Sequence, residues 1–152
     1  IIEDSLIKIS QKHKIIFKVI GNFDYKNSSI TVNNIQWNKK DEIDELLGID
    51  IGVYPLGDEK WISGKSGLKA LQYMALGIPT IATNIGNISN IIDNNIDGLL
   101  VQNTNDDWYK ALDSLINNVD FRKKIGINAK SKITNNYTSE IIKIKYLEII
   151  SK

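Results

Sequence analysis

The sequence contains no cysteine and a single histidine, His13, among its 152 residues. The lack of cysteine excludes disulfide bonds and thiolate chemistry, and it is usual for proteins of a reducing compartment. One histidine is too little for a zinc site or a Ser-His-Asp triad. We expect His13, which lies in a lysine-rich stretch, to be a surface residue, and we expect no metal site in this chain.

Long hydrophobic runs and an excess of charge of either sign are also lacking. No stretch approaches the roughly 20 apolar residues that a membrane span needs, and 19 basic residues against 18 acidic ones give a net charge of +1. The lysines are scattered, so nothing indicates binding to nucleic acid or to an anionic membrane. The length and the hydrophobic fraction of 42% are those of one soluble globular domain.

Helical and strand patterns alternate along most of the chain, and helices alone follow. The predicted strands are 14–20, 30–32, 49–54, 80–83 and 98–101, and the predicted helices are 2–12, 38–48, 67–76, 88–92, 106–117, 119–134 and 139–150. The connections are too long for hairpins, which predicts a Rossmann-like α/β fold, a doubly wound parallel sheet with C-terminal helices. Such sheets bind ligands at the carboxyl ends of their strands, here after Ile20, Tyr54 and Thr83.

The loop from Pro55 to Ser66 is polar and ends in Ser63-Gly64-Lys65-Ser66-Gly67, directly before a predicted helix. Glycines let backbone amides approach a ligand, a helix N-terminus favours an anion, and Lys65 adds a positive charge. This pattern favours a phosphate site. A solvated loop in which Ser66 only caps the helix is the alternative, and spacing does not decide between the two.

A nucleoside triphosphatase is excluded by the same loop. Its phosphate-binding motif needs a glycine five residues before Gly64, where this chain has Glu59. The strand at 80–83 runs into Asn84 and so offers no aspartate for magnesium.

The run from Gly64 to Pro79, GKSGLKALQYMALGIP, resembles the C-terminal domain of group 1 glycosyltransferases, also called family 4, which have the two-domain GT-B fold. The resemblance starts at Ile49 in its clearest part and covers nearly the whole chain. Weaker matches in the expected order support it: Ile81-Ala82-Thr83, Gly86, Asp97-Gly98-Leu99-Leu100-Val101, Arg122, Gly126, Asn128 and Ala129.

The resemblance implies a retaining transfer of a sugar from a nucleotide diphosphate sugar to an acceptor, without a cofactor or a protein-bound metal. Residues 1–152 would form the donor-binding domain, with the first strand of that domain and the N-terminal acceptor domain lying outside the sequence. We expect such a fragment to be inactive alone. The setting implied is bacterial surface polysaccharide or lipopolysaccharide synthesis from a glycan or lipid-linked acceptor, in the cytoplasm or at the inner face of the membrane.

Two glutamates that most members of the family use are replaced here. The first holds sugar hydroxyls and corresponds to Gly64, and the second holds the ribose and corresponds to Gln72. The amide of Gln72 can still bond a ribose hydroxyl, whereas Gly64 cannot replace a carboxylate. Asp58, Glu59 and Ser63 are open candidates for the missing contact. Asn90 also stands where many relatives have glutamate.

The remaining site residues follow from the same resemblance. Lys65 is expected at the diphosphate, and Lys69 is expected on the same side of the helix if that helix begins by Ser66. Lys69 as a plain surface lysine, and Trp37 and Trp108 as packing residues, are the alternatives to a ligand role. Trp61 is expected to be a lid or stacking residue. The predicted donor-binding residues are Gly21, Trp61, Ser63, Gly64, Lys65, Ser66, Gly67, Lys69, Gln72 and Gly86, and no catalytic residue is identified.

Two other functions stay open. A nucleotide-sugar epimerase shares the two-domain architecture, but this chain offers few acid and base side chains for it. A noncatalytic nucleotide-binding module could use the same sheet. A phosphorylated receiver is disfavoured, because its strands would end in clustered aspartates.

Overall fold

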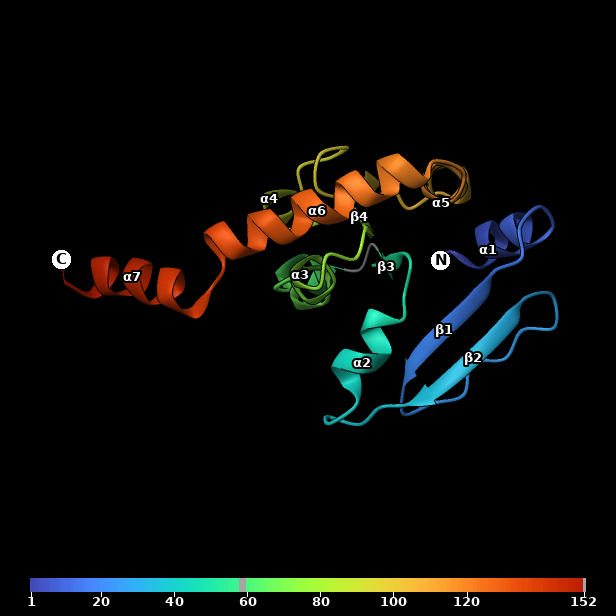
Figure 1. Cartoon of the computed structure of the whole chain (residues 1–152), viewed down its shortest axis with the longest axis horizontal. Coiled ribbons are helices and arrows are strands. Elements are labelled where there is room, and N and C mark those ends of the chain that lie inside the picture. The colour runs from blue at the N-terminus through green and yellow to red at the C-terminus, as the bar shows by residue number, and fades with distance from the viewer. Residues whose placement is uncertain (58–59, 152) are drawn as a thin grey trace.

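The computed structural model describes residues 1–57 and 60–151, and for Lys60 and Ser63 the backbone only. Asp58 and Glu59 lie outside these residues. Along the chain, helices and strands occur in this order (Figure 1): α1 (Glu3–Ser10), β1 (Ile16–Gly21), β2 (Thr31–Gln36), α2 (Glu42–Leu47), β3 (Gly52–Tyr54), the 3₁₀ helix η1 (Lys60–Gly64), α3 (Leu68–Ala75), β4 (Thr80–Thr83), α4 (Ile88–Ile91), β5 (Leu99–Val101), α5 (Asn105–Asn117), α6 (Val119–Asn136) and α7 (Ser139–Ile150).

Every pair of neighbouring strands is parallel, and helices connect the strands except β1 and β2, which are joined by a loop without a helix. The predicted Rossmann-like α/β class is therefore confirmed. The strand bounds differ most in two places. The strand predicted at 30–32 extends to Gln36 as β2, four of whose six residues are exposed, and the strand predicted at 49–54 is reduced to the three residues of β3.

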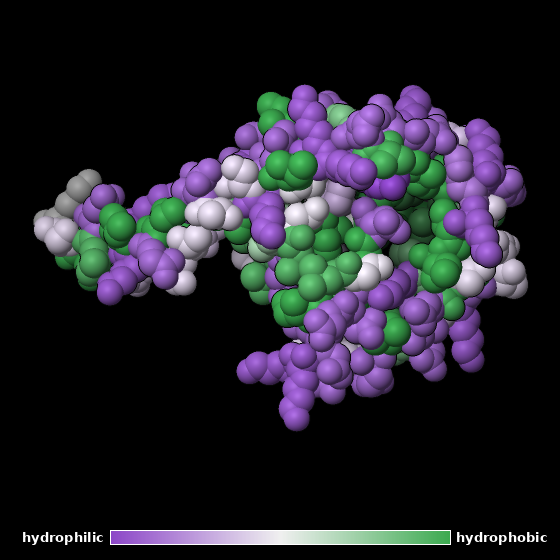
Figure 2. Space-filling model, in the orientation of Figure 1, coloured by the Kyte–Doolittle hydropathy of each residue, from purple (hydrophilic) through white to green (hydrophobic). Residues whose placement is uncertain are grey.

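The strands form two sheets, one of order β1-β2 and one of order β3-β4-β5. Among the strands that the structure describes, no ladder joins β1 to β3, and a cavity of about 500 Å³ lies between them. Phe17, Ile51 and Val53 are among the residues that line the cavity. Figure 2 shows hydrophobic side chains gathered in a hollow at this place. We call this feature the inter-sheet gap.

One hydrophobic core nevertheless serves both sheets. Ile81, Leu99 and Val101 of the second sheet belong to the same buried cluster as residues of α1 and α5, and Phe17 and Val32 of the first sheet pack against it. Trp108 is fully buried in this cluster, as expected for a packing residue. Burial of these side chains holds the sheets together, since apolar burial needs no hydrogen bond between them.

The packing of α6 against α3 depends on a close backbone approach. A Cβ atom at Gly126 would collide with the carbonyl oxygen of Gly77, which ends α3 at a φ of +75°. Two further residues of α6 donate to backbone oxygens: Arg122 Nη1 to Leu115 at 2.8 Å, and Asn128 Nδ2 to Ile96 at 2.8 Å. The weaker matches to the family in α6 thus have structural roles here.

Helix α7 extends away from the body of the molecule (Figure 1). All twelve of its residues are described and none is buried, although seven of them are large and hydrophobic, and six of these seven are exposed. Its start is capped by the side chain of Thr138, which accepts a hydrogen bond from Ile141 N at 3.4 Å. Within residues 1–57 and 60–151, no helix is long and apolar enough to cross a membrane.

Candidate functional site

The loops after the strands are tied to one another at the carboxyl edge. Leu56 N, just after β3, donates to the buried hydroxyl of Thr83 at the end of β4 over 2.9 Å. Trp37 N, just after β2, donates to the carbonyl of Gly21 at the end of β1 over 3.2 Å. These hydrogen bonds hold the first residues of the loops after β2 and β3 against the ends of the neighbouring strands.

The loop after β3 brings two predicted residues together. Lys65 Nζ lies 4.7 Å from the centre of the Trp61 ring, which is the geometry of a cation–π contact. The Trp61 side chain is 66% exposed, and η1 precedes Lys65, whose backbone N donates to Ile62 at 2.9 Å. Trp61 and Lys65 thus present a ring face and a positive charge side by side to solvent.

The start of α3 differs from the expectation. The helix begins at Leu68, because Gly67 has a φ of +77° and does not continue a right-handed helix backwards. A Cβ at Gly67 would overlap Ile91 of α4. Lys65 therefore precedes the helix, and the condition for Lys65 and Lys69 to share one helix face is not met. Ser66 is exposed and its side chain does not cap the helix.

Lys69 and Gln72 both meet a residue that the sequence analysis did not propose. Lys69 Nζ lies 3.1 Å from the Glu42 carboxylate, whose side chain is 17% exposed. This hydrogen bond is the main cause that lowers the pKa of Glu42, and the nearby side chains of Trp37 and Gln72 lower it further. Lys69 is therefore not a free surface lysine.

The position of Glu42 explains why sequence reasoning missed it. In the sequence it is one of several acidic residues in the first turn of a short helix, which is a common helix signal. Trp37, expected to pack, is 43% exposed, and its side chain contributes to the lowered pKa of Glu42. Only the fold brings the loop after β2 to the side of α3.

The predicted ribose residue, Gln72, has an unused acceptor. Its side-chain oxygen, Oε1, is buried and has no hydrogen-bond partner in the part of the chain that the structure describes. A buried amide oxygen without a partner is uncommon in proteins, because burying it removes its hydrogen bonds to water. Gln72 therefore keeps a buried acceptor unpaired on the same face of α3 as Lys69.

The other predicted residues lie at the same edge. Gly86 follows β4 with a φ of +56°, and α4, which comes directly after it, places Ile88 and Ile91 against Gly67. A Cβ at Gly64 would meet no described atom within 4 Å, so the backbone there is open to a ligand. Asn90 is occupied with Asn87, to which it donates at 2.9 Å.

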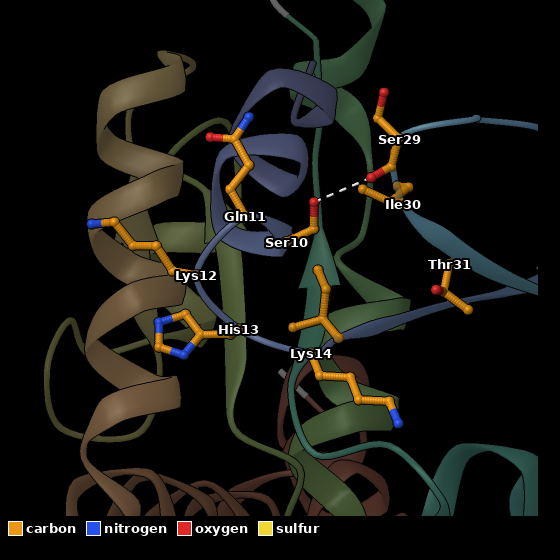
Figure 3. A pocket seen from close by; sticks show the side chains of 9 residues that line it. Ser10, Gln11, Lys12, His13, Lys14, Ser29, Ile30 and Thr31 are labelled. Carbon is orange, nitrogen blue, oxygen red and sulfur yellow. Dashed lines mark hydrogen bonds between the residues drawn. The ribbon is translucent and has the colours of Figure 1, made fainter.

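A second hollow, of about 430 Å³, lies at the opposite edge, before the starts of β1 and β2. Figure 3 shows Lys12, His13 and Lys14 around it, with Ser10 Oγ donating to the Ser29 carbonyl at 3.3 Å. None of the predicted site residues lines it. Its position at the amino ends of the strands separates it from the candidate site.

The parallel α/β fold with its functional loops at the carboxyl edge is that of the C-terminal domain of a GT-B glycosyltransferase. The chain belongs to the group 1 glycosyl transferases, whose family profile matches residues 5–132.

Relatives agree with this assignment. An uncharacterized glycosyltransferase of Methanocaldococcus jannaschii is 30% identical over 117 residues, which are 76% of this chain and 32% of the relative. The C-terminal domain of the group 1 glycosyl transferase LpcC from Francisella tularensis is 26% identical, with a TM-score of 0.61 over 74% of this chain and 56% of that one. HepE of Anabaena, in complex with UDP and glucose, is 13% identical and shares the fold, with a TM-score of 0.66 over 82% of this chain and 32% of that one. The chain spans about a third of the curated relative.

Proposed function

We propose that this chain is the donor-binding part of a retaining glycosyltransferase that uses a nucleotide diphosphate sugar. The acceptor, a glycan or a lipid-linked glycan of a bacterial surface polysaccharide or lipopolysaccharide, would bind to the other domain of the two-domain enzyme. The chain alone would then bind donor and transfer no sugar. The reaction would take place on the cytoplasmic side of the membrane.

The observation that carries the proposal is the pairing of Lys65 with Trp61 at the carboxyl edge. The lysine charge lies 4.7 Å from the ring centre, next to the open backbone of Gly64. A diphosphate needs positive charge and free amides, and a base or sugar ring packs against an aromatic face. In this proposal Lys65 and the backbone of residues 64–67 meet the diphosphate without a metal ion held by the chain. The UDP complex of HepE, which has the same fold, supports the ligand class.

The test is a calorimetric titration of the protein in its natural length with UDP, GDP, ADP and CDP, and with the matching nucleosides. We expect one diphosphate to bind, and Lys65→Ala to weaken it by about 10-fold, because a hydrogen bond between charged groups is lost. Binding of the nucleoside without phosphates should not change. Lys14→Ala is the matched control, since Lys14 is exposed at the opposite edge.

Two results would contradict the proposal. If none of the four diphosphates binds, the chain is better explained as a noncatalytic module. If Lys65→Ala and Lys14→Ala weaken binding equally, the effect is one of net charge, and the phosphate site is not in this loop.

A further inference from the structure

The donor site as predicted has a deficit of negative charge. The resemblance described in the sequence analysis implies glutamates at the positions of Gly64 and Gln72, and neither residue present there carries a charge. A carboxylate accepts a hydroxyl proton more strongly than an amide does. The question is therefore which group near Gln72 can supply a charged acceptor.

Glu42 is that group by position. It is the first residue of α2, and its carboxylate accepts a hydrogen bond from Lys69 on α3 at 3.1 Å. Gln72 lies one turn further along the same helix, on the same side as Lys69, and its side chain also helps to lower the pKa of Glu42. Its side chain is 17% exposed, so it is largely enclosed but still reachable from solvent. The carboxylate of Glu42, which follows one sheet, thus lies near Gln72, the predicted ribose residue, which belongs to a helix of the other sheet.

The carboxylate is held in place and still has capacity. Its two oxygens offer about four acceptor positions, and the hydrogen bond from Lys69 uses one of them. The Lys69 side chain is 49% exposed, so its contact is the one most easily exchanged for a ligand hydroxyl. Hydrogen bonds to the charged form keep the pKa of Glu42 low, so it is ionised near neutral pH.

Gln72 adds a second acceptor beside the first. The amide of Gln72, one turn along α3 from Lys69, carries the buried Oε1 atom that has no partner among the residues described. A pair of neighbouring hydroxyls presents two donors, and Glu42 with Gln72 presents two acceptors.

We propose that Glu42 is a donor-binding residue that, together with Gln72, accepts hydrogen bonds from a vicinal diol of the nucleotide sugar. This inference rests on the proposed function and names a residue that the function alone does not require. Both the ribose and the transferred sugar carry such hydroxyls, so the test separates these two sources.

The test compares Glu42→Gln with the parent protein in its natural length. UDP, GDP, ADP and CDP are titrated first, and the one that binds is then titrated in three forms: the ribonucleotide, the 2′-deoxyribonucleotide and the glucose-bearing nucleotide sugar. We expect Glu42→Gln to weaken the ribonucleotide by about 10- to 100-fold and to leave the deoxyribonucleotide unchanged, because the hydrogen bond lost is one to a charged acceptor.

Glu45→Gln is the matched control. Glu45 lies on the same helix and forms its own ion pair with Lys18 at 2.9 Å, on the side of β1. It should leave the affinity for all three ligands unchanged. Thermal unfolding of both variants checks that each is folded at the temperature of the titrations.

Each outcome decides the matter. A loss for the ribonucleotide and the glucose-bearing form, but not for the 2′-deoxyribonucleotide, assigns the diol to the ribose. A loss for the glucose-bearing form alone assigns it to the sugar, and both results support the inference. Equal losses for all three forms, or no loss, would overturn it and leave the proposed function standing. Failure of all four diphosphates to bind the parent would overturn the proposed function and this inference with it.

Discussion

Single glycine residues set the distances between several elements of this chain. A Cβ at Gly52 of β3 would lie 2.6 Å from the ring of Tyr73, and a Cβ at Gly98 would lie 2.7 Å from Ile92. A Cβ at Gly126 would strike backbone rather than a side chain, and backbone cannot rotate away. We therefore expect a Cβ at Gly126 to lower the stability of the fold, since the backbone of α3 would have to move to make room for it.

We expect Gly126→Ala to lower the free energy of unfolding by about 1–3 kcal/mol, measured by urea denaturation. Alanine favours a helix over glycine by roughly 1 kcal/mol, so a mere propensity effect would have the opposite sign. Gly64→Ala is the control for stability, with an expected change below about 0.5 kcal/mol, since its Cβ would enter open space. A more stable Gly126→Ala variant would contradict the close approach of α6 to α3.

The identities of Lys65, Trp61 and Gln72 as site candidates could be predicted, because they lie in one continuous loop and helix. Glu42 could not be, since its contact with Lys69 spans 27 positions and depends on how two sheets face each other. The left-handed conformation of Gly67 moved the helix start by one residue from the prediction. Local sequence patterns thus predict site residues that lie near one another in the sequence. They do not predict partners, such as Glu42, that only tertiary packing brings close.

At the scale of elements, α6 and α7 contrast sharply. Both have a helical pattern in sequence, and the predicted bounds of α7, 139–150, agree with the structure. α6 contributes Ile125 and Ala129 to the buried residues and packs on α3, whereas α7 contributes none. Hydrophobic periodicity predicts that a helix forms and does not tell what it packs against.

Matched substitutions on the two helices should therefore differ. Ile125 is 1% exposed, so Ile125→Ala should lower the free energy of unfolding by about 2–5 kcal/mol, because a buried side chain is removed and a cavity remains. Ile149 is 72% exposed, so Ile149→Ala should lower it by less than about 0.5 kcal/mol. Chemical denaturation of the chain gives both values. Similar losses for the two variants would show that α7 is packed in solution.

At the scale of the whole molecule, two sheets share one core without a hydrogen-bonded ladder between them. In the larger sheet, all four residues of β4 are buried, whereas β1 has no fully buried residue. The alternation of strands and helices predicted a doubly wound parallel sheet, and the parallel α/β class is confirmed. Among the strands described, the hydrogen-bonded ladder is divided in two, because β1 and β3 face each other across the inter-sheet gap.

Native-state hydrogen exchange should distinguish the two sheets. We expect the amides of β1 and β2 to open at a lower free energy than those of β4, since the smaller sheet has two strands and partly exposed faces. Low denaturant concentrations should accelerate the first group before the second. Equal opening free energies for the two sheets would contradict this and would indicate one cooperative unit.

The width of the inter-sheet gap also affects the distance between Glu42 and Gln72. Hydrogen-bonded strands lie about 4.8 Å apart, so a single strand seated in the gap would hold β1 and β3 about two such spacings from each other. Glu42 follows the sheet on one side of the gap and Gln72 follows the sheet on the other. The distance between the Glu42 carboxylate and the Gln72 amide therefore depends on the width of the gap, and a change in that width would change this distance.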